Sequence, residues 1–144
     1  MCVQGNNAHD EQNTAAVFQD QASSASFVSA ARVVDAVSLL PGCNGEQADG
    51  VKAYTQSLLY NSKPGDQGHV DTWVMLPEDQ WPTSWNGKFS RPVVRLRLAL
   101  YGHPLACAFW GRHSKEAILS VGFQTIPDWD GVFVHLELQL VLSV

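Results

Sequence analysis

The chain has 144 residues, of which 45% are hydrophobic and 16% are charged, and its formal net charge is −5. This length allows at most one domain or part of one, and the apolar content suffices for a core. The sequence contains no run of about 18 apolar residues and no charged start followed by an apolar stretch, so neither a membrane span nor a signal peptide is predicted. We therefore expect an intracellular protein without a membrane partner.

Charge is distributed unevenly along the chain. The segment Lys88–Lys115 holds six of the nine Lys and Arg residues and no Asp or Glu, whereas the first 49 residues hold six acids and one base. This asymmetry fits either a phosphate-binding face or an ordinary solvated surface. The three cysteines (Cys2, Cys43 and Cys107) are widely spaced and odd in number. They indicate reduced thiols, in agreement with an intracellular location.

The first half of the chain carries one clear helical pattern. Apolar residues at helical spacing predict a helix over residues 24–40, which Pro41-Gly42 ends. A short strand is expected over residues 45–49. Residues 51–60 fit either a short helix or extended chain, and the Pro and Gly residues within 61–69 predict a loop.

The second half is predicted to alternate strands with one helix. The expected elements are a strand over 72–76, an irregular loop over 78–90, a strand over 92–100, a helix over 105–121, a turn over 126–131 and a strand over 134–144. Alternation in the strand over 92–100 places Arg95 and Arg97 on one face. The mixture of hairpins and helices predicts an α+β fold with a mixed or antiparallel sheet packed by helices.

Few patterns in the chain carry recognisable chemistry. The five histidines and three cysteines lack the close spacing of a structural zinc site, and no G-x-S-x-G, P-loop or G-x-G-x-x-G occurs. Asp128 and Asp130 are interpreted as turn residues. Asp49 has two interpretations. A carboxylate at the end of a strand suits Mg²⁺, whereas Asp49-Gly50 is also a common turn dipeptide.

Several blocks of the sequence resemble, in order, those of copia-type retrotransposon reverse transcriptases. "QADGVKAYTQSLL" (47–59) resembles the first catalytic motif, in which a strand ends in Asp49 and a small residue and an aromatic follow. "TWVMLPEDQWP" (72–82) resembles the next hairpin. "RPVVRLRLALYGHPLACAFW" (91–110) is similar to a basic strand followed by Leu-Tyr-Gly and a closing Trp. "SVGF" (120–123) matches the end of the next helix, and "VQGNN" (3–7) resembles the end of the first fingers strand.

This resemblance implies a partial right-hand polymerase fold in a single partial domain, with a fingers-like segment over 1–44 and a palm-like segment over 45–144. Asp49 would be catalytic and bind Mg²⁺. Tyr54 would lie under the sugar of the incoming nucleotide, where its ring excludes a 2′-hydroxyl, or else be a core aromatic. The other implied residues are Ala53 beside Tyr54, Tyr101 and Gly102 against template and nucleotide, and Arg95 and Arg97 near the primer-template or structural in the palm.

The sequence also departs from the family pattern. The Tyr-x-Asp-Asp box, which supplies two of the three catalytic carboxylates, would begin where "LVLSV" ends the sequence, and Leu105 stands where the family usually carries a Gln. The resemblance therefore implies a fragment of an RNA-directed DNA polymerase that is inactive as it stands. Its implied partners are an RNA or DNA primer-template, a deoxynucleoside triphosphate and the remainder of a retrotransposon polyprotein.

Two other interpretations remain open at this stage. One is a non-enzymatic nucleic-acid-binding module that uses the basic segment Lys88–Lys115. The other is an unrelated interaction domain in which the motif matches are accidental.

Overall fold

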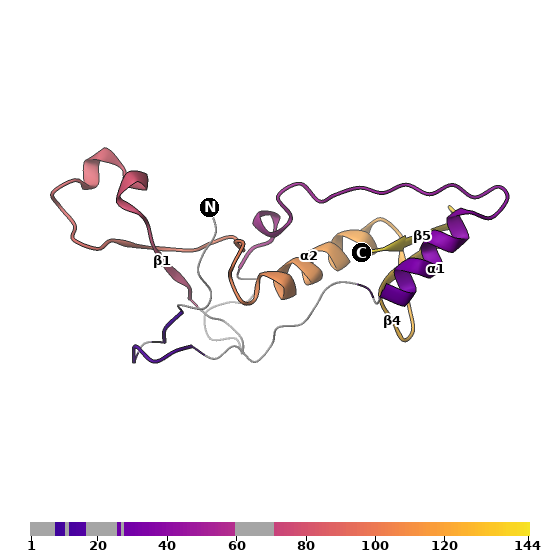
Figure 1. Cartoon of the computed structure of the whole chain (residues 1–144), viewed down its shortest axis with the longest axis horizontal. Coiled ribbons are helices and arrows are strands. Elements are labelled where there is room, and N and C mark those ends of the chain that lie inside the picture. Colours follow the sequence, from indigo (N-terminus) through magenta and orange to yellow (C-terminus); the bar gives the residue numbers. More distant parts are fainter. Residues whose placement is uncertain (1–7, 11, 17–25, 27, 60–70) are drawn as a thin grey trace.

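The chain forms short helices and strands along an elongated molecule (Figure 1). The computed structural model describes residues 8–10, 12–16, 26, 28–59 and 71–144. The predicted features at 3–7 and 61–69 therefore lie outside the described residues. In chain order the elements are α1 (Val28–Ser38), η2 (Ala53–Gln56), β1 (Trp73–Met75), η3 (Glu78–Gln80), η4 (Thr83–Trp85), β2 (Val93–Arg95), α2 (Ala106–Ser120), β3 (Gln124–Ile126), β4 (Trp129–His135) and β5 (Leu140–Ser143), where η denotes a 3₁₀ helix.

The strands of the described residues form two small antiparallel sheets. In the first sheet β1 pairs with β2, so that Trp73 lies opposite Arg95 and Met75 lies opposite Val93. In the second sheet the strand order is β3-β4-β5, and each neighbour is antiparallel. Two helices and two antiparallel sheets make an α+β fold, which confirms the predicted class at this level.

Both predicted helices are present, α2 with nearly its predicted bounds and α1 over a shorter range. α2 spans Ala106–Ser120, within one residue of the prediction at each end. Pro104 precedes it, and Gly122 follows with φ +97°, a left-handed conformation that favours glycine after a helix. α1 covers residues 28–38 of the predicted 24–40 helix, and the chain turns at Pro41-Gly42 as expected, with Gly42 at φ +83°.

One apolar cluster lies between η2, β2 and the start of α2. Its buried members are Leu59, Ala99 and Ala106, and the half-buried residues packed against them are Tyr54, Leu96 and Phe109. The backbone of residues 57–59 pairs antiparallel with residues 97–99 through the Leu59 N–H to Arg97 carbonyl bond of 3.0 Å and the Ala99 N–H to Ser57 carbonyl bond of 2.9 Å. The cluster therefore joins segments that are about forty residues apart in sequence.

A second packing unit joins α1 to the three-stranded sheet. α1 packs against β4 and β5, and its buried residue is Ala30, while Val132 and Phe133 are the buried residues of β4. In Figure 1 this unit lies at one end of the molecule, the β1 region lies at the other end, and α2 lies between them.

Hydrogen bonds fix the chain just before α1 to the end of β5. The Ser26 N–H donates to the Val144 carbonyl at 2.7 Å, and the Ser26 and Ser143 hydroxyls are 2.7 Å apart. The Val144 N–H in turn donates to the Gly131 carbonyl at 2.8 Å. Gly131 has φ +74°, and a Cβ placed on it would lie 2.7 Å from the Ser26 backbone. Only glycine at this position allows such close backbone approach.

Two predicted strands are wrong. Residues 134–144 form a hairpin, because β4 ends at His135, the chain turns over residues 136–139 and β5 returns from Leu140. Gln139 makes this turn with φ +54°, an uncommon conformation for a residue with a side chain. Residues 45–49 have no regular structure and are exposed, since none of the described strands pairs with them to supply the hydrogen bonds that a strand requires.

The remaining local predictions are largely confirmed. Strands occur within the predicted ranges 72–76 and 92–100, and residues 126–131 contain the tight turn at Pro127-Asp128. Residues 51–60 contain η2, and the loop over 78–90 contains η3 and η4. No helix among the described residues has the length and apolar character needed to cross a membrane.

Candidate functional site

Asp49 lies in the exposed segment between α1 and η2. Residues 43–50 have no regular secondary structure, and each is exposed. The next residue, Gly50, lies close to α2, because a Cβ placed on it would be 3.6 Å from Cζ2 of Trp110 and 3.5 Å from Cβ of Ala53. Asp49 therefore lies one residue before the position at which the chain approaches α2.

A short 3₁₀ helix presents Tyr54 to α2. Lys52 precedes η2 with φ +53°, and its carbonyl accepts hydrogen bonds from the Thr55 backbone N–H at 3.0 Å and the Thr55 hydroxyl at 2.9 Å. The side-chain amide of Gln56 donates to the Val51 carbonyl at 2.7 Å. These local bonds hold the turn in which Ala53 and Tyr54 are half-buried.

Tyr54 contacts two residues from distant parts of the chain. Its ring meets the ring of Tyr101 edge to face, with centroids 4.6 Å apart and an interplanar angle of 61°. Its hydroxyl lies 3.2 Å from Sγ of Cys107 on the first turn of α2. The hydrogen bond with Cys107 raises the pKa of Tyr54 above its ordinary value, and burial raises it further.

The segment Tyr101-Gly102 forms the turn that leads into α2. Gly102 has φ +86°, which only glycine adopts at low cost, and Tyr101 is 44% exposed. This turn brings the Tyr101 ring over η2 and leaves one side of it open to solvent. The structure thus places three predicted site residues, Tyr54, Tyr101 and Ala53, near one another.

His103 supports this turn from inside. The Leu105 backbone N–H donates to Nδ1 of His103 at 3.2 Å, so that Nδ1 carries no proton. Nε2 then carries the proton and donates to the Thr72 hydroxyl at 3.1 Å. His103 is 7% exposed, and burial lowers its pKa below the ordinary value because the charged imidazolium is desolvated. This ring connects the start of β1 to the start of α2.

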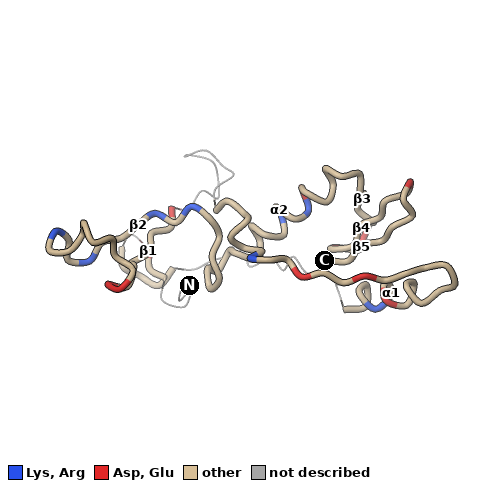
Figure 2. Tube along the Cα trace, turned by 90° about the horizontal axis from the view of Figure 1, so that it is seen from above, with Lys and Arg blue, Asp and Glu red and all other residues tan. Residues whose placement is uncertain are grey.

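The two predicted arginines differ in their surroundings. Nη2 of Arg95 lies 2.5 Å from Oδ1 of Asp71, and both side chains are a little under half exposed. Arg95 therefore has a structural ion pair. Arg97 is exposed, and its carbonyl takes part in the pairing with Leu59. Figure 2 shows Lys and Arg along β2, along α2 and at the outer end of the β1–β2 hairpin.

The described residues do not fit a site for two magnesium ions. Asp49 could supply one carboxylate, but no group of three or more His, Cys, Asp or Glu side chains able to hold a metal occurs among residues 8–10, 12–16, 26, 28–59 and 71–144. Two-metal phosphoryl transfer requires several carboxylates around both ions. This part of the chain therefore lacks the set of ligands that a two-metal site requires.

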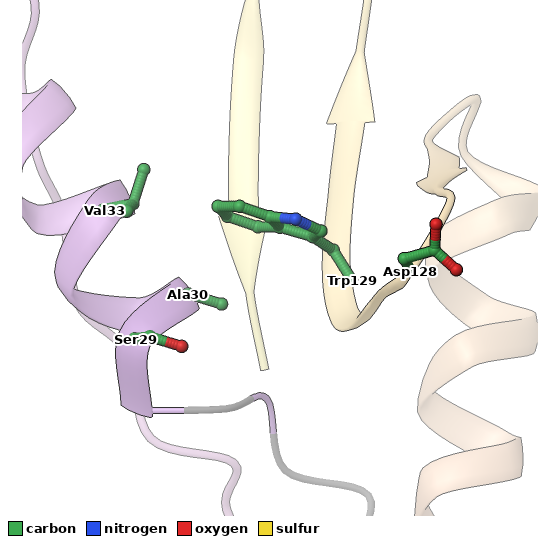
Figure 3. A pocket seen from close by; sticks show the side chains of 5 residues that line it. All are labelled: Ser29, Ala30, Val33, Asp128 and Trp129. Carbon is green, nitrogen blue, oxygen red and sulfur yellow. The ribbon is translucent and has the colours of Figure 1, made fainter.

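A shallow cavity of about 200 Å³ lies between α1 and the β3–β4 turn. Figure 3 shows the Trp129 ring lying across it towards Ala30 and Val33, with Asp128 turned away from α1. Ser29 also lines the cavity. Its lining is mainly apolar, and none of the predicted site residues contributes to it.

Sequence reasoning missed two residues of this region, Cys107, which contacts Tyr54, and His103, which supports the turn before α2. Cys107 was considered only as a reduced thiol, and His103 only as one of five scattered histidines. A sequence signal existed for both, since His103 directly follows Leu-Tyr-Gly and Cys107 lies in the first turn of the predicted helix. Their contacts with Tyr54 and Thr72 nevertheless depend on long-range packing, which a local pattern does not specify.

Comparison with known proteins gives no relative for this chain. No protein-family model, curated protein or solved structure matches it.

Proposed function

We propose that this chain is a segment of a copia-type retrotransposon reverse transcriptase, in which residues 1–44 are fingers-like and residues 45–144 are palm-like. The proposal includes the finer fold, a partial right-hand polymerase. It also includes the ancestral chemistry, which is RNA-directed nucleotidyl transfer from a deoxynucleoside triphosphate to a primer. The remainder of the polyprotein is the proposed covalent partner.

The observation that carries the proposal is the contact between sequence blocks that resemble the family separately. The ring of Tyr54, from the first block, lies against the ring of Tyr101, from the third block, with the two centroids 4.6 Å apart. The two blocks also pair through the Leu58–Leu98 bridge. β1 from the second block pairs with β2 from the third. Segments of one ancestral site are expected to meet in space, whereas accidental matches have no reason to do so.

Within this proposal Tyr54 and Tyr101 shape the nucleotide pocket. The Tyr54 ring is fixed by its edge contact with Tyr101 and by the Cys107 thiol, so its position is defined without a ligand. A fixed ring discriminates by steric exclusion, because a sugar that carries an additional hydroxyl meets the ring before it can bind. Ala53 and Gly102 are proposed to lie beside these two rings in the pocket.

Asp49 is proposed as the first carboxylate of the ancestral metal site. When Mg²⁺ is bound in such polymerases, it stabilises the charge that develops on the transferred phosphate. The 144 residues contain no Tyr-x-Asp-Asp box. We therefore propose that they have no polymerase activity on their own.

Primer extension tests the proposed inactivity. The chain is incubated with a labelled DNA primer on an RNA template, deoxynucleoside triphosphates and Mg²⁺ or Mn²⁺, and the Asp49→Asn variant serves as the control. We expect no extension by either protein. Extension by the wild type that the Asp49→Asn variant lacks would refute the inactive state.

The gene sequence beyond the codon for Val144 tests the lineage separately. We expect codons for a Tyr-x-Asp-Asp box soon after this point, in the same frame or after a frameshift or stop. Absence of such codons in every frame would overturn the assignment to the reverse transcriptases and would favour an unrelated domain.

A second candidate function is favoured by the charge of one segment. Lys88–Lys115 carries six basic residues without an acid, and its Arg97 is exposed. This supports a non-enzymatic nucleic-acid-binding module. Its test is the affinity for nucleic acid as a function of salt, which should fall steeply as counterions compete. A flat salt dependence would count against this function.

A further inference from the structure

The β1–β2 sheet has one face that is open to solvent. Trp73 lies opposite Arg95 and Met75 lies opposite Val93, and directly opposed residues of antiparallel strands project from the same face. Trp73 is 58% exposed, Met75 47% and Val93 53%, whereas the valines between them are half-buried. We call the surface formed by these four residues the outer face. It presents an indole ring directly beside an arginine.

Basic side chains continue along the edge of this face. The Leu96 N–H donates to the Thr72 carbonyl at 2.8 Å, which extends the pairing one residue beyond β2. Arg97 therefore follows the same alternation as Arg95 and is exposed. Residues two apart in a strand are separated by about 6.8 Å. This separation is on the order of that between successive phosphates of an extended strand.

The ion pair with Asp71 holds Arg95 at the outer face. In this pair Nη2 lies 2.5 Å from Oδ1, which fixes one end of the planar guanidinium group of Arg95. A fixed guanidinium loses less conformational entropy when it binds a phosphate than a free lysine does. The ion pair therefore orients Arg95 beside the Trp73 ring, which is 58% exposed.

The charge around the outer face is slightly positive. Residues 71–100, which contain both strands, carry four Lys and Arg and three Asp and Glu, although the whole chain has a net charge of −5. Lys88 and Arg91, which belong to this set, lie in the connection between β1 and β2. Arg112 and Lys115 lie further along the molecule on α2 (Figure 2).

The exposed Trp73 ring favours single-stranded over double-stranded nucleic acid. This ring can stack on a base only where the face of the base is free, as in a single strand, because duplex bases already stack on one another. We propose that the outer face binds single-stranded nucleic acid, with one base stacked on Trp73 and the neighbouring phosphates at Arg95 and Arg97. This inference deepens the second candidate function and rests on the basic segment proposed there.

Binding of labelled oligonucleotides tests the proposal. The probes are an oligothymidylate and an oligouridylate of about 12 nucleotides, together with a DNA duplex of equal length. We expect the wild type to bind the single strands about tenfold or more tightly than the duplex. Trp73→Ala should weaken single-strand binding about 5- to 150-fold, the range measured for loss of one base–aromatic stack. Arg97→Ala should reduce the slope of log K against log salt by about one.

Matched variants separate stacking from loss of fold. Trp129→Ala removes a tryptophan that is 38% exposed in the other sheet, and it should bind like the wild type. Trp73→Phe should retain most of the affinity, whereas Trp73→Leu, which keeps apolar bulk without an aromatic ring, should not. Circular dichroism verifies the fold of each variant.

Four results would overturn the inference. Equal affinity of Trp73→Leu and Trp73→Phe would show that no base stacks on this ring. Duplex binding as tight as single-strand binding would show that only charge is recognised. Equally tight binding of an acidic peptide such as oligoglutamate would make the face a protein-binding surface. Complete absence of binding would reject the second candidate function as well, whereas each of the first three results would leave part of it standing.

Discussion

Replacement of Gly131 by alanine tests the packing of α1 on the three-stranded sheet. Gly131 has φ +74°, and an added Cβ would lie 2.7 Å from both the Cα and the N of Ser26. A residue with a side chain loses about 1–2 kcal/mol in this left-handed conformation. The overlap is with backbone atoms, so it can be relieved only if Ser26 moves away from β5.

That movement would break two hydrogen bonds. These are the bond from the Ser26 N–H to the Val144 carbonyl and the one between the Ser26 and Ser143 hydroxyls, both 2.7 Å long. Each contributes about 0.5–1.5 kcal/mol net to stability. Together with the conformational cost, Gly131→Ala should lower the free energy of unfolding by about 2–5 kcal/mol.

The chain contains a matched control for the conformational cost alone. Gly87 has φ +72°, and a Cβ placed on it would meet no atom within 4 Å. Gly87→Ala should therefore cost only about 1–2 kcal/mol. Urea denaturation followed by circular dichroism measures both values, and hydrogen exchange of the Ser26 amide reports the local bond. Equal destabilisation by the two variants, with unchanged protection of Ser26, would refute this reasoning.

Three further predictions concern single side chains. Cys107→Ala should lower the pKa of Tyr54 towards its ordinary value, because the main cause of its elevation is removed, and tyrosinate absorbance at alkaline pH measures this. Burial lowers the pKa of His103, so the unfolded chain binds a proton first, and stability should fall below pH ~6.5 by at most about 1.4 kcal/mol at pH 5.5. His103→Gln should remove this dependence in thermal unfolding. Asp71→Asn should cost less than about 1 kcal/mol in urea denaturation, because both it and Arg95 are nearly half exposed.

Each of these predictions has a control and a contrary outcome. Cys43→Ser replaces another exposed cysteine and should leave the Tyr54 titration unchanged, whereas an unchanged titration in Cys107→Ala would contradict the contact. The His113→Gln variant should keep the pH dependence of unfolding. If this variant lost the pH dependence, His103 would be excluded as its source. A cost for Asp71→Asn well above 1 kcal/mol would mean that the pair is more protected from solvent than its exposure indicates.

Local patterns in the sequence predicted the helices and the β1–β2 strands well. α2 has a helical stripe bounded by Pro104 and Gly122, and residues 92–100 alternate between half-buried and exposed positions along most of their length. These features arise from interactions between residues close in sequence. Their positions therefore follow from spacing alone.

The hairpin at the end of the chain could not be predicted in the same way. Apolar and polar residues alternate from Val134 through the turn to Leu140, Val141 alone breaks the pattern before Val144, and the turn contains neither Gly nor Pro. The turn instead depends on Gln139 at positive φ and on pairing of β5 with β4. Tertiary pairing overrides the local pattern here.

The candidate site was predicted as a set of residues but not as an arrangement. The spacing from Asp49 to Tyr54 suggested a common site, yet Asp49 lies in an irregular exposed segment rather than at the end of a strand. The contacts of Tyr54 with Tyr101 and Cys107 join residues about fifty positions apart. Sequence spacing carries no information about such contacts when no relative supplies their pairing.

The bonds between Ser26 and the end of β5 have a consequence for synthesis. The hydroxyls of Ser26 and Ser143 belong to residues 117 positions apart, so α1 is made long before the strands that cover it. At about 5–20 residues per second, the interval lasts about 6–23 s. During that time Ala30, which is buried in the folded protein, has no strand to cover it. Chaperones that bind nascent chains have their longest opportunity at this segment, and its release must await translation of the last strand.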